Sequence, residues 1–269
     1  MTPLGRSVPY WHVDAFASAP YTGNQAAVMI LDAWPADALL QAIGAENNFA
    51  ETAFLVPDTS GGSDWELRWF TPLDEIRLCG HATLAAGHVL LGLDATRDAV
   101  RFRTRRAGVL EVRRGAEMAY EVALPAIPTA PGEWPQAVAA MGAEPLALRR
   151  SPDGYNLLVY GSAEEVTGLS PNMRHLAVLG PDSFTVTAPG RDTDVVSRVF
   201  IGGVQAGEDS VTGSAHAVLA PYWVERLGRA NFTAHQASAR GGYLTCRLDG
   251  SRVWLGGDCV TVVEGRFFL

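Results

Sequence analysis

The sequence predicts an α+β fold with two similar domains, each a mixed sheet curved around one central apolar helix. Two stretches carry this prediction. Cys79-Gly80-His81 opens an apolar run over residues 81–91, and Thr212-Gly213-Ser214 opens a second over residues 213–227, about 133 positions later. A separation near half the chain length indicates an internal repeat. Helices that are apolar on nearly all sides must be buried on all sides, and a sheet curved around each is the natural solution.

The segments around these helices support the repeat, because residues 108–113 and 242–247 share a pattern that begins with Gly at nearly the same offset. In the first half, a helix is expected from Pro35 to about Asn47. Alternating or continuous apolar residues predict the strands of this half. These cover residues 10–16, 26–31, 51–56, 65–70, 100–103, 108–113 and 118–124.

The segment 125–135 holds four prolines and cannot lie inside a sheet. It is therefore predicted to be a linker between a first domain at residues 1–124 and a second at residues 136–269. The second half is expected to contain a short helix at 136–141 and helical turns at 163–175. Its expected strands cover residues 156–160, 183–187, 196–200, 232–237, 243–247, 252–255 and 260–263.

Composition restricts the class of protein. Of the 269 residues, 48% are apolar and 19% are charged, which is typical of a globular protein. The net charge of −8 argues against a nucleic-acid partner, whose phosphates require a basic surface. No apolar run is long enough to span a bilayer, so no membrane partner and a cytoplasmic location are expected. The three cysteines are scattered and odd in number, so disulfides are not expected.

Glu51 is the candidate acid–base residue. It stands directly before an apolar strand, so part of its surroundings should be dry, which suits a carboxyl group that carries a proton. The alternative is an exposed carboxylate at a strand entrance with no role in chemistry.

The two helix starts are candidate binding sites, because free N–H groups and partial positive charge there suit a small carboxylate. His81 and Asp209 lie near them and could orient a substrate or move a proton; the alternatives are a helix-start residue and an ordinary turn residue. Ser214 and the backbones of Gly80 and Gly213 could hold the carboxylate. The alternative is that Gly-Ser only caps the helix, which is an equally common use of this pair at a helix start. The ligand is expected between the two helix starts.

Other chemistries fit the sequence poorly. Its histidines show no ligand spacing with Cys, Asp or Glu, so no metal is expected; they are His12, His81, His88, His175, His216 and His235. There is no phosphate-binding loop with its Lys and no dinucleotide fingerprint, so no cofactor is expected. Cys79 could be a nucleophile, because a helix N-terminus lowers a thiol pKa, but a buried inert thiol is the favoured interpretation.

Several motifs occur in a fixed order along nearly the whole chain. They are Val13-Asp14-Ala15-Phe16, Gly23-Asn24, Glu51-Thr52-Ala53-Phe54, Phe70-Thr71-Pro72, Leu78-Cys79-Gly80-His81, Gly207-Glu208-Asp209 and Thr212-Gly213-Ser214-Ala215. Together they closely resemble the PhzF-like family of phenazine-biosynthesis-type isomerases. The resemblance implies the diaminopimelate-epimerase fold, with a barrel-like sheet around a central helix in each domain, and a homodimer.

The resemblance also implies a function. In the family a Glu at the position of Glu51 shuttles a proton between carbon atoms of a small cyclic carboxylate without a cofactor. The supporting His and Asp fall on His81 and Asp209. The residues expected to bind substrate are Asn24, Gly80, Thr212, Gly213 and Ser214. Three residues depart from the family pattern, so the substrate pocket is expected to differ from that of the phenazine enzymes: Gln25, Ala50 and Ser210.

Two alternatives remain. A two-base racemase or epimerase of the diaminopimelate or proline type would need a thiol at each helix start. Thr212 stands where the second thiol would be, and its hydroxyl is too weak an acid to replace a thiolate. The other alternative is a protein that binds small carboxylates without catalysis.

Overall fold

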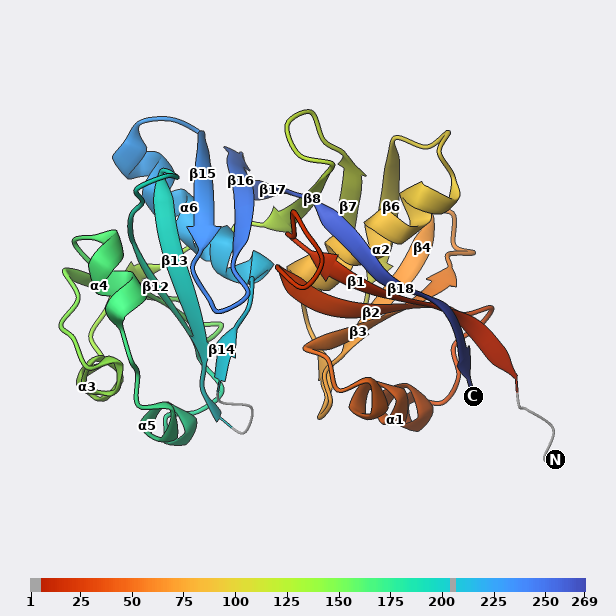
Figure 1. The fold of residues 1–269 in the computed structure, drawn as a ribbon, viewed down its shortest axis with the longest axis horizontal. Coiled ribbons are helices and arrows are strands. Elements are labelled where there is room, and N and C mark those ends of the chain that lie inside the picture. Colours follow the sequence, from red (N-terminus) through yellow and green to blue (C-terminus); the bar gives the residue numbers. More distant parts are fainter. Residues whose placement is uncertain (1–5, 204–206) are drawn as a thin grey trace. The chain divides into compact units, whose positions relative to one another are not determined.

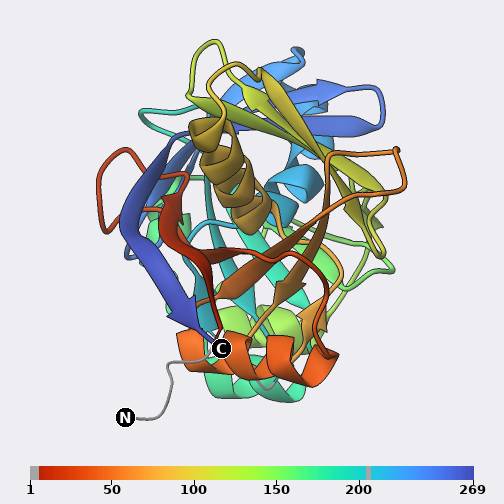
Figure 2. The same ribbon diagram turned by 90° about the vertical axis from the view of Figure 1, so that its right-hand side faces the viewer.

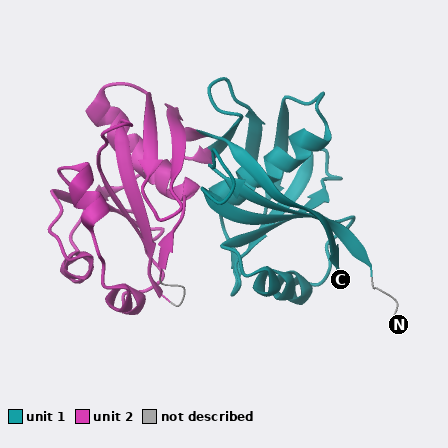
Figure 3. Cartoon of the chain, viewed as in Figure 1, with its two compact units in different colours: residues 1–123, 256–269 teal, residues 124–255 magenta. Residues whose placement is uncertain are grey.

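The computed structural model describes residues 6–203 and 207–269, which form two compact units (Figures 1 and 3). Unit 1 combines the chain up to residue 123 with residues 256–269, and unit 2 spans residues 124–255. Helices and strands are mixed in both, which confirms the predicted α+β class. Within the described residues, none of the helices is long and apolar enough to cross a membrane.

Unit 1 is built on a mixed sheet with the strand order β18–β1–β2–β3–β4–β6–β7–β8, and β5 pairs with the end of β4. The pairs β2–β3 and β4–β6 are parallel and the others are antiparallel. The bounds are β1 Ser7–Ala15, β2 Asn24–Ile30, β3 Glu51–Pro57, β4 Trp65–Phe70, β5 Glu75–Ile76, β6 Ala99–Thr104, β7 Val109–Arg114, β8 Tyr120–Pro125 and β18 Cys259–Phe268.

The long helix of unit 1, α2 (Gly80–Leu93), forms the centre of its core. Eleven of its fourteen residues are buried, and it packs against β1, β2, β3, β6 and β7. Figure 2, which faces unit 1, shows strands on both sides of this helix. Gly87 permits the close approach of β7, because a Cβ there would lie 2.3 Å from Cγ1 of Val112. The second helix of the unit, α1 (Asp37–Asn47), packs on β3 and β4.

Unit 2 repeats this topology. Its strand order is β9–β10–β11–β12–β13–β15–β16, β14 pairs with β13, and β11–β12 and β13–β15 are the parallel pairs. The order and the directions match those of β18–β1–β2–β3–β4–β6–β7. The bounds are β9 Ala130–Pro131, β10 Ala147–Arg150, β11 Tyr155–Val159, β12 Ser183–Pro189, β13 Val195–Ile201, β14 Gly207–Asp209, β15 Asn231–Gln236, β16 Gly242–Asp249 and β17 Arg252–Gly257.

The long helix of unit 2, α6 (Gly213–Leu227), packs against β11, β12 and β16. It contains Pro221, which has no N–H to donate to the Ala217 carbonyl one turn earlier. The N–H of Ile127 donates to that carbonyl instead, at 3.1 Å. The internal proline is therefore tolerated because another segment supplies the missing donor. Three short helices complete the unit: α3 Pro135–Met141, α4 Ala163–Gly168 and α5 Met173–Val178.

The boundaries of the two units differ from those predicted for the two domains. The last strand, β18, pairs with β1 along its whole length, so residues 256–269 belong to unit 1. The segment 125–135, predicted to be a linker, belongs to unit 2, since β9 pairs with β10 and Ile127 binds α6. Its prolines exclude a sheet interior, but they leave the carbonyls and the remaining N–H groups free to pair at an edge.

Candidate active site

The start of α2 lies at one edge of the unit 1 sheet, where two parallel strands begin. Asn24 is the first residue of β2 and Glu51 is the first residue of β3, with Glu51 opposite Ala26. Because both strands run in the same direction, their first residues share an edge. Cys79 is the extended residue that precedes α2, and its carbonyl accepts hydrogen bonds from both the backbone and the hydroxyl of Thr83.

The imidazole of His81 is the centre of this cluster. Its Nε2 lies 2.9 Å from Oε2 of Glu51, and its Nδ1 lies 3.1 Å from Nδ2 of Asn24. The Cys79 sulfur lies 3.5 Å from Nδ1 and 4.0 Å from Nε2. The structure therefore brings together Glu51, His81 and Asn24, three of the residues that the sequence named as candidates, and adds Cys79 to them.

Glu51 is neither fully buried nor openly exposed, since 15% of its side chain is accessible. Its Oε2 atom is itself inaccessible to solvent, and among the described residues no donor is aligned for a hydrogen bond to it. The 2.9 Å contact with His81 is thus a close ion-pair distance without hydrogen-bond alignment. A buried carboxylate oxygen without an aligned donor is costly to maintain for structure alone.

The charge state of His81 depends on opposing effects. Burial alone would lower the pKa of this ring, but the Cys79 sulfur and the Glu51 carboxylate beside it outweigh burial and raise the pKa well above its ordinary value. Asn24 can serve either state: its amide N–H donates to a neutral ring at Nδ1, and its oxygen, after a half turn of the amide, accepts from a charged one. His81 can therefore hold positive charge beside the Glu51 carboxylate.

The Cys79 thiol is poorly suited to act as a base. Burial above all, together with the negative charge of Glu51, raises the pKa of Cys79 to about 11. Its surface is 4% exposed. The group is consequently a protonated thiol near neutral pH, which agrees with the interpretation of an inert buried cysteine rather than a nucleophile.

The start of α6 forms a second group of polar residues, within unit 2. The Thr212 hydroxyl donates to Oδ2 of Asp209 at 2.6 Å, and its backbone N–H donates to Oε1 of Gln236 at 2.8 Å. The amide of Gln236 in turn donates to the Asp209 carbonyl at 2.8 Å. Gln236 is fully buried and fixes the entry into α6. Sequence reasoning missed it, although a Gln inside a buried strand was a usable signal.

The predicted carboxylate-binding residues occupy the first turns of the two long helices. Gly80 and Gly213 are each the first residue of a helix and are buried, and Ser214 is partly exposed. Neither Cys79 before α2 nor Thr212 before α6 caps its helix with a side-chain hydrogen bond, so these N-cap side chains leave the backbone N–H groups of the first turns available to a ligand. The eight predicted site residues thus form one group at the α2 start and one at the α6 start.

His216 lies in the first turn of α6 and is fully buried. Its Nδ1–H donates to the Thr212 carbonyl at 2.8 Å, while Nε2 has no hydrogen-bond partner among the described residues. Burial lowers the pKa of this ring to about 4, so it is neutral near neutral pH. Nothing in the sequence indicated that the His216 ring would be buried and neutral.

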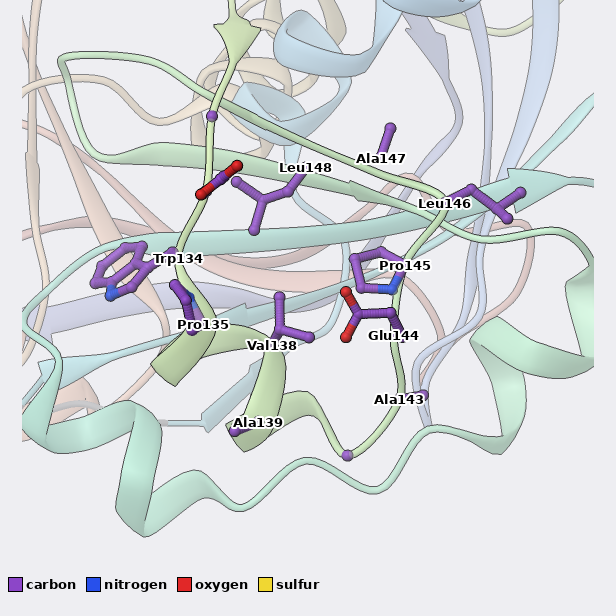
Figure 4. A pocket seen from close by; sticks show the side chains of 13 residues that line it. Trp134, Pro135, Val138, Ala139, Ala143, Glu144, Pro145, Leu146, Ala147 and Leu148 are labelled. Atoms are coloured by element: carbon purple, nitrogen blue, oxygen red, sulfur yellow. The ribbon is translucent and has the colours of Figure 1, made fainter.

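A pocket of about 720 Å³ lies elsewhere in unit 2, beside α3 and the segment 142–148 (Figure 4). Trp134 and Leu148 line it together with the carboxylate of Glu144. None of the predicted site residues lines this pocket. Its size therefore carries no information about the chemistry at the helix starts.

Comparison with known proteins places these features in context. The model of the phenazine biosynthesis-like protein family, PhzC-PhzF, matches residues 13–265. An uncharacterised isomerase of Pseudomonas aeruginosa is 43% identical over 97% of this chain and 98% of its own length. The crystal structure of a PhzF-family phenazine biosynthesis protein from Enterococcus faecalis has a TM-score of 0.88 and 37% identity, covering 98% of this chain and 100% of that chain.

A protein of Pseudomonas aeruginosa described as a predicted epimerase has a TM-score of 0.76 and 23% identity, with 97% of this chain and 99% of that chain covered. At that identity the likeness concerns the fold alone. It agrees with the expected relation between this architecture and epimerases.

Proposed function

The chain belongs to the phenazine biosynthesis-like (PhzC-PhzF) family of isomerases, and on that premise we propose that it moves a proton between carbon atoms of a small carboxylate substrate. Glu51 acts as the general acid and base, and no cofactor takes part. The carboxylate of Glu51 takes a proton from one carbon and returns it to another. No atom or electron is gained or lost overall.

The observation that carries the proposal is the Oε2 atom of Glu51, buried and without an aligned donor beside the His81 ring. An oxygen for which no donor is aligned in the described part of the chain is available to accept a proton from a substrate. The positive charge that His81 can hold would stabilise the carboxylate after it gives the proton back. His81 thereby supports the half of the transfer in which Glu51 returns the proton.

Substrate binding is assigned to the helix starts. The backbone N–H groups at the α2 start (Gly80) and those at the α6 start (Gly213 and Ser214) each suit a substrate carboxylate, and Asp209 with Thr212 would orient polar groups at the α6 start. Asn24 is 2% exposed and its amide faces His81. We therefore assign Asn24 the role of positioning His81, in place of the direct substrate contact expected from the sequence.

The two-base racemase gains no support from the site. Its chemistry requires a thiolate at each helix start, whereas Cys79 is a protonated thiol and Thr212 donates its hydroxyl to Asp209. A non-catalytic binding protein would have no use for a buried carboxylate oxygen without an aligned donor. The homodimer implied by the family resemblance and the cytoplasmic location expected from the apolar pattern of the sequence stay predictions.

The proposal is tested by incubating the protein in D₂O with small cyclic and amino carboxylates, after removing metals with EDTA. Proton transfer through Glu51 predicts that proton NMR will show isomerisation, or exchange of a C–H proton for deuterium, in one of them. If a compound instead raises the melting temperature but never isomerises or exchanges, the protein is a binding protein and the proposal is wrong.

A further inference from the structure

The side chains of Glu51, Cys79 and His81 form a cluster of three different metal-binding groups. One oxygen, one sulfur and one ring nitrogen from these residues lie within 4.8 Å of one another. We propose that this cluster is a binding site for Zn²⁺, with the metal acting as an inhibitor. The binding stands on the geometry of the cluster, whereas the inhibitory effect rests on the proposed function of Glu51.

The separations suit a tetrahedral metal. Zn²⁺ binds Cys sulfur at about 2.3 Å and His nitrogen or carboxylate oxygen at about 2.0–2.2 Å, so neighbouring ligand atoms lie roughly 3.3–3.6 Å apart. The two measured distances from His81 Nε2, 2.9 Å to the Glu51 oxygen and 4.0 Å to the Cys79 sulfur, lie on either side of this range. All three ligand atoms lie within 4.8 Å of one another, so modest side-chain rotations would place the three groups around one ion.

Asn24 can hold the His81 ring in place through a hydrogen bond to Nδ1, the ring nitrogen that does not bind the metal. A His that binds a metal through one ring nitrogen almost always donates the N–H of the other to a nearby acceptor, which fixes the ring. The Asn24 amide lies 3.1 Å from Nδ1 and can turn its oxygen toward it. Nε2 then remains free to bind the metal beside the Glu51 oxygen, for which no donor is aligned among the described residues.

The donor set also selects the metal. A thiolate, an imidazole and a carboxylate suit Zn²⁺, while Mg²⁺ and Ca²⁺ require oxygen ligands alone. One thiolate and one carboxylate balance the two positive charges of the ion, which favours binding in a buried place. The protonated state of Cys79 is no obstacle, because a bound metal removes the proton of a coordinating thiol.

Zn²⁺ bound in this way would stop proton transfer. Its bond to Glu51 occupies the oxygen that takes the proton, and its bond to His81 removes the positive charge that supports the carboxylate. The site would therefore make the isomerase sensitive to free zinc, without any part for the metal in the reaction itself.

Co²⁺ tests the binding without any assay of activity, because a thiolate bound to Co²⁺ gives a charge-transfer absorption band in the near ultraviolet. The full chain, freed of metals, is titrated with Co²⁺ and then with Zn²⁺. We expect one equivalent of Co²⁺ to produce the band and one equivalent of Zn²⁺ to remove it. Failure of the wild-type protein to show the band overturns the proposal, whatever the variants do.

Two cysteine variants locate the band. Cys79→Ala should abolish it, whereas Cys246→Ala should keep it, because Cys246 is equally buried but lies in unit 2 with no metal-binding group of this cluster. The reverse result, or a band that survives in Cys79→Ala, overturns the proposal.

Asn24→Ala tests the support of the ring. It should weaken Zn²⁺ binding about 10–100-fold while the charge-transfer band of the Co²⁺ form remains, which a merely structural role would not produce. Unchanged affinity contradicts the assigned arrangement. If the band behaves as expected but Zn²⁺ leaves turnover unaffected, the metal site stands and the proposed role of Glu51 fails, so the two proposals are separable.

Discussion

The His81 ring is held by residues that are far apart in the chain. Asn24 and Glu51 come from the starts of two parallel strands, and Cys79 comes from the residue before α2. The sequence identified Glu51, His81 and Asn24 as candidates, because the motifs that contain them are recognisable. It assigned Asn24 to the substrate, since one sequence cannot show which way a buried amide points.

The cluster of Glu51, Cys79 and His81 was not predicted from the sequence for a related reason. Ligand spacing along the chain was judged from neighbouring residues, and Cys79 and His81 alone make a weak signal. Glu51 reaches them only through the parallel pairing of β2 and β3, which is a long-range contact. Sites assembled from separate strands are therefore invisible to spacing rules.

His216 allows a test of pH dependence at a single residue. Its pKa is about 4 in the folded protein and near 6.5 in an unfolded chain, so between these values the unfolded state binds the extra proton. Folding stability should consequently fall as the pH falls through this window. The loss from pH 7 to pH 5 is about 2 kcal/mol for this group.

The variant His216→Leu removes the titrating ring and keeps the site apolar, while the Thr212 carbonyl retains the backbone N–H of residue 216 as a donor. Urea unfolding at pH 7 and pH 5 should show a smaller loss of stability in the variant than in the wild type. Equal losses in the two proteins would mean that the buried ring does not titrate as described.

At the scale of elements, α2 was the most predictable part of the structure. Its apolar composition required burial on all sides, and eleven of its residues are buried among the strands of unit 1. The helix also contains Gly87, whose absent Cβ leaves room for Val112 on β7. The sequence alone could not predict this contact, because it does not show which residue of another element packs against a glycine inside a helix.

Two glycines of α2 form a matched pair for testing this contact. Gly87→Ala should destabilise the protein by about 1–3 kcal/mol, because the new Cβ would overlap the Val112 side chain. Gly92→Ala should instead stabilise it by up to ~1 kcal/mol, because Gly92 is exposed, has no atom within 4 Å of a new Cβ, and Ala is the better helix former. Denaturant unfolding measures the change in the free energy of unfolding for both variants. Equal destabilisation of the two would contradict the claim that close packing against Val112 distinguishes Gly87 from Gly92.

At the scale of the whole molecule, the repeat was predictable and its ends were not. Strand order and directions recur in both units, as the matching helix starts indicated. The last strand of each repeat, however, pairs with the first strand of the other: β18 with β1, and β9 with β10. Local patterns predict that a strand exists but not which distant edge receives it, so the linker and the second boundary were misplaced.

The central claim is that Glu51 carries the proton, and the steady-state turnover number of Glu51→Gln tests it most directly. Glu46 is exposed, so Glu46→Gln is the matched control. Cys79→Ala tests the alternative that the thiol carries the proton. On the substrate found in the D₂O screen, with metals removed, Glu51→Gln should stay folded and lose 10²–10⁴-fold or so in turnover. Glu46→Gln should be unchanged and Cys79→Ala should lose far less. Turnover that survives in folded Glu51→Gln but disappears in Cys79→Ala would contradict the account and make the thiol the chemical group.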